Sequence, residues 1–189
     1  TVSLTAADNT GGTGVARTEY QVDAATEWTA YTEPVLVSGD GSHEVRFRSV
    51  DGAGNVEAAR SVAVRVDATA PVTTATFAPA NDDGWHAGTV PVVLTAADTV
   101  GGSGVSTVEY ALDGGAWTPY TQPVDITGDR THELHYRSVD AAGNVETVKS
   151  AVLKIDATRP TLLVSGIADG QLYGDSQDVR ITFQAVDPT

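Results

Sequence analysis

RSVDGAGNVE, at residues 48–57, and RSVDAAGNVE, at residues 137–146, differ at one position in ten. The similarity continues outward on both sides, because residues 2–71 align with residues 92–160 once a single extra residue is allowed in the first copy. Self-similarity on this scale is the mark of a chain assembled from copies of one structural unit. The sequence therefore predicts an array of repeats rather than one large domain.

The repeating unit spans about 89 residues, which suits an independent domain of immunoglobulin size better than a stacked solenoid repeat. Within the unit, apolar and polar residues alternate with a period of two, as residues 90–96 and 107–112 show. This alternation is typical of antiparallel strands with one buried face. We expect an all-β fold of tandem sandwiches, with seven strands in a complete unit. They should lie near residues 72–77, 89–97, 105–112, just after Trp117, 123–127, 131–139 and 145–155.

The alignment divides the chain into three parts. Residues 1–67 form a first repeat that lacks about 20 residues at its front, and residues 68–156 form a complete second repeat. Residues 157–189 match only the start of a third, divergent repeat, in which VRITFQAVD at 179–187 stands where PVVLTAAD stands at 91–98. Because Thr1 opens in the middle of the pattern, we expect the chain to be a piece of a longer protein.

The second repeat carries a series of short motifs, and the first repeat shares most of them, with Asp23-Ala24-Ala25 in place of the Asp-Gly-Gly turn. In the second repeat the motifs are Asp83-Gly84-Trp85, Thr95-Ala96-Ala97-Asp98, Ser103-Gly104-Val105, Glu109-Tyr110, Asp113-Gly114-Gly115, Trp117, Tyr120, Pro123, Arg137 to Glu146, and Asp156 to Pro160. Together they resemble the immunoglobulin-like, or fibronectin III-like, modules of bacterial secreted and surface proteins, which are often attached to carbohydrate-active enzymes.

The resemblance implies tandem β-sandwiches outside the cell, in a secreted or surface-attached protein. It implies an accessory or spacer role in which the partners are other domains of the same polypeptide. A fold alone does not say what a module binds. Polysaccharide or a cell-surface glycan is the external partner that such a setting suggests.

Composition excludes several classes of function. The formal net charge of −14 argues against nucleic acid as a partner, because phosphates attract Lys and Arg. The absence of Cys excludes a disulfide scaffold. No apolar run is long enough to span a membrane. The sequence also lacks a Gly-x-Ser-x-Gly elbow, an HExxH motif and a phosphate-binding loop, so we expect no enzyme activity.

Aspartates recur where strands end, and this placement predicts a calcium site at the joint between the first two repeats. The linker residue Asp67 should lie near Asp98, Asp140 and Asn144, and side-chain oxygens from separate segments are the ligands that Ca²⁺ takes. Asp156 and Asp187 should serve the next joint in the same way. A structural alternative stays open, because Asp also closes turns by accepting backbone N–H groups.

An aromatic pair recurs at the same spacing in both repeats, as Trp28 with Tyr31 and Trp117 with Tyr120. If exposed, such a pair could stack on a sugar ring, which would make each repeat a carbohydrate-binding module. The alternative is that the pair covers one end of the sandwich, with neighbouring prolines making a rigid corner. A non-catalytic structural spacer, with calcium at its joints, remains the function that the sequence favours.

Overall fold

The structure is a computed structural model that describes residues 1–174, 178 and 180–187. It is an all-β protein, with 48% of the chain in strands and no helix in the described residues. Accordingly, the described residues contain no helix long and apolar enough to cross a membrane. The chain divides into two compact units. The first comprises residues 1–72 with the segments 96–106 and 138–146, and the second comprises residues 73–95, 107–137 and 147–189.

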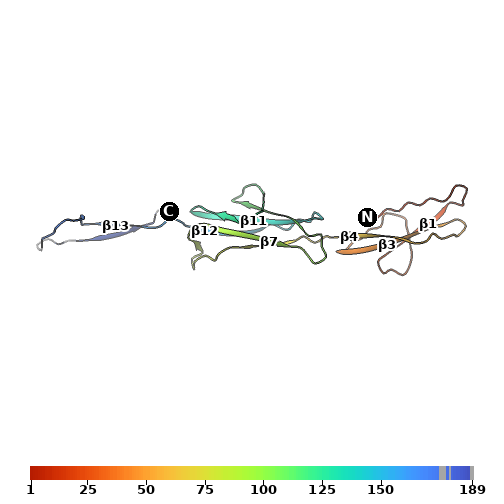
Figure 1. The fold of residues 1–189 in the computed structure, drawn as a ribbon, viewed down its shortest axis with the longest axis horizontal. Helices are drawn as coiled ribbons and strands as arrows, with labels where there is room; N and C mark the ends of the chain where they lie inside the picture. The colour runs from red at the N-terminus through yellow and green to blue at the C-terminus, as the bar shows by residue number, and fades with distance from the viewer. Residues whose placement is uncertain (175–177, 179, 188–189) are drawn as a thin grey trace. The chain divides into compact units, whose positions relative to one another are not determined.

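The first repeat is built on one four-stranded antiparallel sheet (Figure 1). Its strands, in spatial order, are β2 (Thr29–Ala30), β1 (Val15–Val22), β3 (Gly41–Asp51) and β4 (Arg60–Val66). The register sets Glu19 on β1 directly opposite Arg48 on β3. An opposing sheet is represented only by an isolated bridge between Val2 and Val35. Residues 3–7 form no strand, although their counterparts in the second repeat, residues 93–97, do.

The second repeat contains two sheets that share one core, which is a sandwich-like arrangement. One sheet has the order β10 (Val124–Ile126), β7 (Val90–Ala97), β5 (Val72–Thr76). The other has the order β6 (Trp85–His86), β12 (Lys149–Ile155), β11 (Arg130–Asp140), β8 (Val105–Leu112), β9 (Thr118–Pro119). Alternate residues of both sheets meet in the core, namely Val90, Val92, Leu94, Ile126, Leu134, Tyr136, Leu153 and Ile155.

Most strands of the second repeat lie where the alternation predicts them, and two details differ. Strand β6 was not expected, because two residues carry no readable period; it pairs in parallel with β12. The last strand begins at Lys149 rather than near residue 145, and Val145 instead makes a single bridge to Val139. The turn between these two residues is held by this bridge and by hydrogen bonds from Asn144 to the Asp140 side chain.

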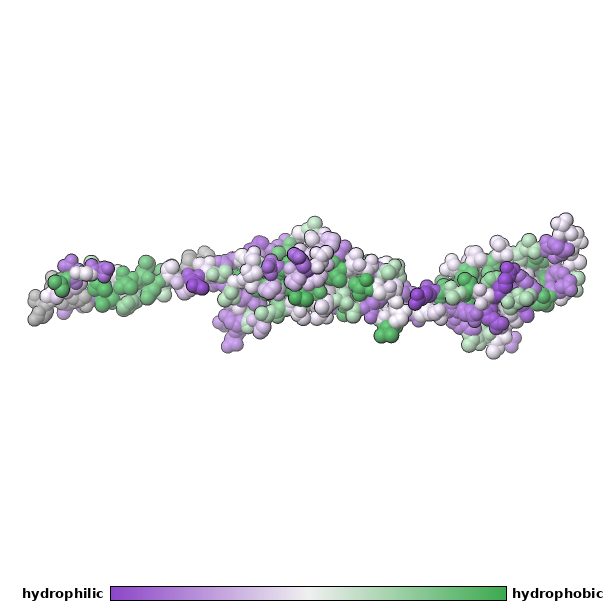
Figure 2. Space-filling view, viewed as in Figure 1, coloured by the Kyte–Doolittle hydropathy of each residue, from purple (hydrophilic) through white to green (hydrophobic). Residues whose placement is uncertain are grey.

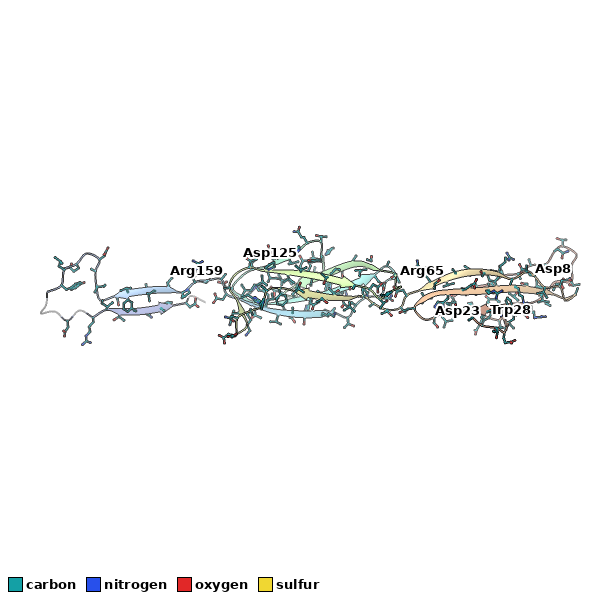
Figure 3. All side chains as sticks on the ribbon, turned by 60° about the horizontal axis from the view of Figure 1, so that its bottom comes forward. Asp8, Asp23, Trp28, Arg65, Asp125 and Arg159 are labelled. Atoms are coloured by element: carbon teal, nitrogen blue, oxygen red, sulfur yellow. The ribbon has the colours of Figure 1, made fainter. Side chains whose placement is uncertain are left out.

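A histidine fixes the hairpin turn of each repeat. In the first, His43 contacts Asp23 Oδ2 through Nδ1 and the Gly39 carbonyl through Nε2, both at 2.9 Å. With two acceptors, both ring nitrogens can donate only in the protonated form. The hydrogen bond from His43 to Asp23, whose side chain is labelled in Figure 3, raises the pKa of His43 accordingly. Asp23 has a φ of 52°, and its counterpart Asp113 repeats the conformation and the contacts.

The described part of residues 157–189 forms a two-stranded hairpin of β13 (Thr161–Ser165) and β14 (Thr182–Val186). Its apolar side chains are exposed: Leu162 is 63% and Phe183 64% accessible. Figure 2 shows apolar side chains gathered on this segment. The third repeat predicted for residues 157–189 includes residues 175–177, 179, 188 and 189, which lie outside the described residues. The three domain boundaries stay predictions.

Leu134→Ala is expected to lower the free energy of unfolding by about 2–5 kcal/mol, because Leu134 is fully buried in the core and truncation leaves a cavity. Val152→Thr on the neighbouring strand is the control. Val152 is 61% accessible, so its replacement by another β-branched residue should change the same quantity by less than about 0.5 kcal/mol. Urea titrations of both variants measure this. Equal losses would contradict the placement of the core.

Candidate functional site at the linker aspartate

Three aspartates from separate segments meet within the first compact unit. Asp67 follows β4, Asp98 follows β7 and Asp140 ends β11. One carboxylate oxygen from each lies within 4.8 Å of the others. Asp140 is 2% accessible, and the other two are partly buried. In the part of the chain that the structure describes, this is the one group of three or more residues with potential metal-ligand atoms gathered in this way.

Asp98 closes the loop that follows β7. Its Oδ1 accepts the N–H of Thr99 at 2.8 Å, and its Oδ2 accepts the N–H of Gly104 at 2.7 Å. The loop passes so close that a Cβ on Gly102 would lie 2.6 Å from Asp98 Oδ2. A side chain at position 102 would therefore force the Asp98 carboxylate to shift from this position.

The first repeat makes the same closure with its own aspartate. Asp8, at the loop end of the first sheet (Figure 3), accepts the N–H groups of Asn9 and Gly14, each at 2.8 Å. Asp8 and Asp98 therefore make the same pair of backbone hydrogen bonds, so loop closure is a structural role that both repeats share.

Asp140 and Asn144 hold the turn of the motif that is duplicated in the sequence. Asp140 accepts the backbone N–H of Asn144 at 2.8 Å through Oδ1 and its side-chain amide at 2.7 Å through Oδ2. Gly143 completes the turn with a φ of 95°, which glycine adopts without strain. Asp51 and Asn55 repeat the two hydrogen bonds at 2.8 and 2.7 Å.

Asp67 connects the linker to both of these loops. Its Oδ2 accepts the N–H of Ser103 at 2.6 Å, and its backbone carbonyl accepts the side-chain amide of Asn144 at 3.0 Å. Ser103 also reaches the second loop, because its Oγ accepts the N–H of Ala142 at 3.0 Å. Hydrogen bonding by the Ser103 side chain, and then by its backbone, holds the pKa of Asp67 below its ordinary value. The carboxylate is therefore ionised at neutral pH.

The cluster offers an oxygen-rich environment that suits a hard cation. Three carboxylates with a neighbouring amide side chain are oxygen ligands of the kind that Ca²⁺ takes, six to eight in number. The carboxylates also repel one another, which a cation would relieve. The backbone N–H groups described above partly offset that repulsion on their own. Both the calcium hypothesis and the structural alternative are compatible with these contacts.

The residues expected at the second joint lie in the second compact unit. Asp156 and Asp187 line one pocket together with Trp85 and His86. Asp156 Oδ1 accepts the N–H of Thr158 at 3.1 Å. Among the described residues, these two aspartates belong to no group of three potential metal ligands, so the structure brings two carboxylates into one pocket without a third.

Two residues that hold the linkers in place were not predicted from the sequence. Asp40 accepts the N–H of Ala68 at 2.7 Å and a hydrogen bond from Thr69 Oγ1. Asp129 does the same for the next linker, accepting the N–H of Ala157 at 2.7 Å. A signal existed, because a Gly-Asp pair stands at the same place in both repeats, at residues 39–40 and 128–129.

The recurrent tryptophans are partly buried and stacked against arginines. The Arg48 guanidinium carbon lies 4.0 Å from the ring centroid of Trp28, and that of Arg137 lies 4.2 Å from the ring centroid of Trp117. Each arginine also pairs with a glutamate on the adjacent strand, Arg48 with Glu19 at 2.9 Å. One face of each ring is thus occupied by a cation–π contact.

The tyrosines of the same motif are partly buried as well. Tyr120 packs against the core of the second repeat, and its backbone N–H donates to the Val108 carbonyl at 2.8 Å. Tyr31 makes the equivalent backbone hydrogen bond to Thr18, also at 2.8 Å. These contacts give Trp and Tyr a role in covering the sheet, and no contact here favours the carbohydrate-binding alternative.

Comparison of the sequence with models of known protein families gave no match, and comparison with curated proteins gave none.

Acid is expected to weaken the contribution of Asp67 to stability. Its folded-state pKa lies below the ordinary value of 3.8, so the stabilisation is present above that value and is lost as the pH falls through the folded-state pKa. Asn at position 67 cannot titrate. The difference in melting temperature between the wild-type chain and Asp67→Asn should therefore shrink as the pH is lowered from about 5 to below the folded-state pKa. A difference that stays constant over that range would contradict the hydrogen-bonding account.

Proposed function

We propose that this chain is a non-catalytic structural array: tandem immunoglobulin-like modules that act as a spacer or accessory region in a larger secreted or surface-attached protein. The observation that carries the proposal is the double attachment of Asp67. Ser103 and Asn144, from two different loops, both hydrogen-bond to this one linker residue. A linker held in this way is restricted in its motion, as a spacer requires.

The rest of the linker supports the same role. Asp40 holds Ala68 and Thr69, and Pro71 is fully buried. Proline also restricts the residue before it to extended conformations. A Gly/Ser linker would behave instead as a flexible coil. The short segment 67–71 has the composition and the contacts of a stiff connection.

The immunoglobulin-like assignment is part of the proposal. The second repeat has strands in two sheets around one core, and this sandwich-like arrangement supports the assignment. The first repeat has the same register as the second in two strand pairs, β1–β2 and β3–β4, and it has the same loop aspartates and the same histidine at the hairpin turn. The resemblance to bacterial modules also supplies the extracellular setting and the partners, which are other domains of the same polypeptide.

Calcium at the linker aspartate is the refinement that the clustered carboxylates support. An extracellular module is expected to bind it weakly, with a dissociation constant on the order of 10⁻⁴–10⁻³ M. At about 10 mM calcium and a constant of about 1 mM, binding to the folded state alone adds roughly 1.4 kcal/mol to its stability. This is large enough to measure in a thermal unfolding experiment.

Calcium is expected to raise the melting temperature of the 189-residue chain, measured by circular dichroism with increasing CaCl₂ after EGTA treatment. Asp98→Asn should abolish the rise, because it removes one of the three carboxylates. Asp8→Asn is the matched control, since Asp8 makes the same two loop hydrogen bonds outside the cluster. It should lower the starting melting temperature while leaving the calcium response intact.

Magnesium at the same concentration controls for ionic strength and for general screening. A melting temperature that does not change with saturating calcium would remove the metal from the proposal. An equal loss of the calcium response in Asp8→Asn and Asp98→Asn would place the effect elsewhere on the chain.

A further inference from the structure

The turn that leads into β3 connects a histidine to the linker. His43, near the start of β3, contacts the carbonyl oxygen of Gly39 through Nε2 at 2.9 Å. The next residue of the turn, Asp40, accepts the backbone N–H of Ala68 at 2.7 Å and a hydrogen bond from Thr69 Oγ1. Two consecutive residues thus carry the contact to the imidazole and the contact to the linker.

The second repeat builds the same connection. His132 contacts the Gly128 carbonyl oxygen through Nε2 at 3.1 Å. Asp129 accepts the backbone N–H of Ala157 at 2.7 Å and a hydrogen bond from Thr158 Oγ1. Because the arrangement recurs residue for residue in both copies, it is a feature of the repeat and not of one loop.

The turn at residues 39–41 depends on such contacts for its shape. Gly39 and Gly41 flank Asp40 with φ values of 95° and 136°, and glycine has so many accessible conformations that backbone preference alone does not select these. Asp40 is exposed, so packing does not select them either. The contact between His43 and the Gly39 carbonyl therefore helps to hold Asp40 where it meets the linker.

Both acceptors next to His43 are satisfied only by the imidazolium form. Nδ1 lies 2.9 Å from Asp23 Oδ2, and Nε2 lies 2.9 Å from the Gly39 carbonyl oxygen. A neutral imidazole has one N–H, so its other nitrogen would direct a lone pair at an acceptor. The N–H should stay on the carboxylate side, because hydrogen bonds to charged groups are the stronger ones. Deprotonation then removes the hydrogen bond to Gly39.

The surroundings of His43 favour the imidazolium. The hydrogen bond to Asp23, followed by the contact with the Gly39 carbonyl, raises the pKa of His43 above its ordinary value of 6.5. On β4 the residue opposite His43 is the uncharged Val64. The other charged side chains on the neighbouring segments are Asp40 on the turn, Glu44 on β3 and Arg65 on β4.

Asp23 depends on a histidine more than its counterpart Asp113 does. Asp113 Oδ2 also accepts a hydrogen bond from Arg130 Nη2 at 2.7 Å, and the first-repeat counterpart of Arg130 is Gly41. In the part of the chain that the structure describes, His43 is the one cationic group that pairs with Asp23. Loss of the histidine proton should therefore disturb the first repeat more than the second.

We propose that protonation of His43 controls how firmly the linker is attached to the first repeat. The imidazolium holds the Gly39 carbonyl and keeps Asp40 within reach of Ala68, and loss of the proton releases the turn. Because the folded-state pKa is raised, the attachment is complete below the ordinary value of 6.5 and weakens as the pH rises through the folded-state pKa. A stiffer array in mildly acidic surroundings follows, and this last step rests on the proposed spacer role.

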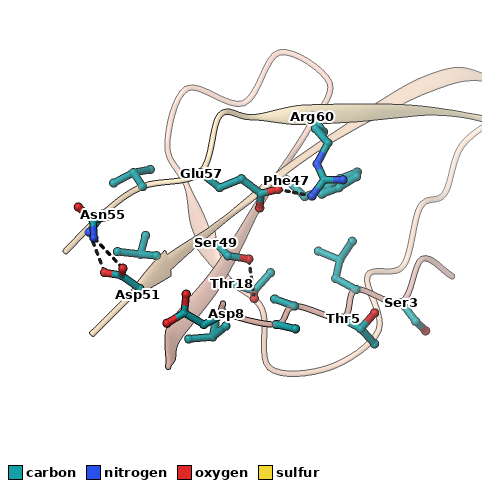
Figure 4. Close-up of a pocket in the computed structure, with 16 residues that line it drawn as sticks. Ser3, Thr5, Asp8, Thr18, Phe47, Ser49, Asp51, Asn55, Glu57 and Arg60 are labelled. Atoms are coloured by element: carbon teal, nitrogen blue, oxygen red, sulfur yellow. Dashed lines mark hydrogen bonds and ion pairs between the residues drawn. The ribbon is translucent and has the colours of Figure 1, made fainter. Parts of the chain in front are cut away.

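The test is an NMR titration of the ¹³C,¹⁵N-labelled 189-residue chain in EGTA, from about pH 5.5 to about pH 8.5. The ring signals of His43 give its pKa, and amide exchange relative to the intrinsic rate at each pH gives the protection of Ala68. That protection should fall at least about threefold, with the midpoint of the His43 signals. Asn55 is the control, because its N–H donates to Asp51 Oδ1 at 2.8 Å at the other end of β3 (Figure 4). Its protection should not follow that midpoint.

His43→Gln removes the titrating group and should leave the protection of Ala68 independent of pH. Ala157, whose linker contact lies beside His132, is the matched control in the same variant and should behave as in the wild-type chain. A response of Ala68 that persists in His43→Gln would overturn the proposal.

Two results in the wild-type chain would also overturn it. In one, His43 titrates while the protection of Ala68 stays constant. In the other, His43 does not titrate over this range. Neither result affects the spacer role, because Asp67 is attached through Ser103 and Asn144, which carry no group that titrates there.

Discussion

Aspartate carboxylates that accept backbone N–H groups hold the loop end of both repeats in place. Asp8 and Asp98 each close a loop with two such hydrogen bonds, and Asp51 and Asp140 close the neighbouring turn through an asparagine. A backbone N–H left without an acceptor is costly, so these contacts determine where the loops lie. The loops in turn create the surface to which Asp67 attaches.

The duplicated motif is explained mainly by this constraint. In RSVD-x-AGN-x-E the aspartate and asparagine close the turn, and the glycine supplies the positive φ. Glu146 accepts both the backbone N–H and the hydroxyl of Ser138 at 3.0 Å. Most of the repeated residues have a role inside their own repeat. Asn144 additionally reaches the linker, through its hydrogen bond to the Asp67 carbonyl.

The long strands could be predicted from the sequence because alternation over eight or more residues is hard to mistake. Residues 105–112 were expected as a strand and are β8. Strand β6 could not be predicted, because two residues are too few to show an alternating pattern. The linker contact of Asp40 could not be predicted either, because Gly-Asp at residues 39–40 resembles an ordinary turn. The sequence placed Asp67 near Asp98 and Asp140 because loops and linker share one end of a sandwich. Stacking of Arg48 on Trp28 depends on the path of a loop that the pattern does not encode.

The proposed role of the linker depends on whether its carboxylates bind metal as well as N–H groups. Small-angle X-ray scattering of the 189-residue chain, first with calcium and then with excess EGTA, tests this most directly. If Asp67, Asp98 and Asp140 are metal ligands, removal of calcium loosens the linker and the maximum dimension changes between the two curves. Superimposable curves would contradict the calcium joint and leave hydrogen bonds and proline as the source of any stiffness.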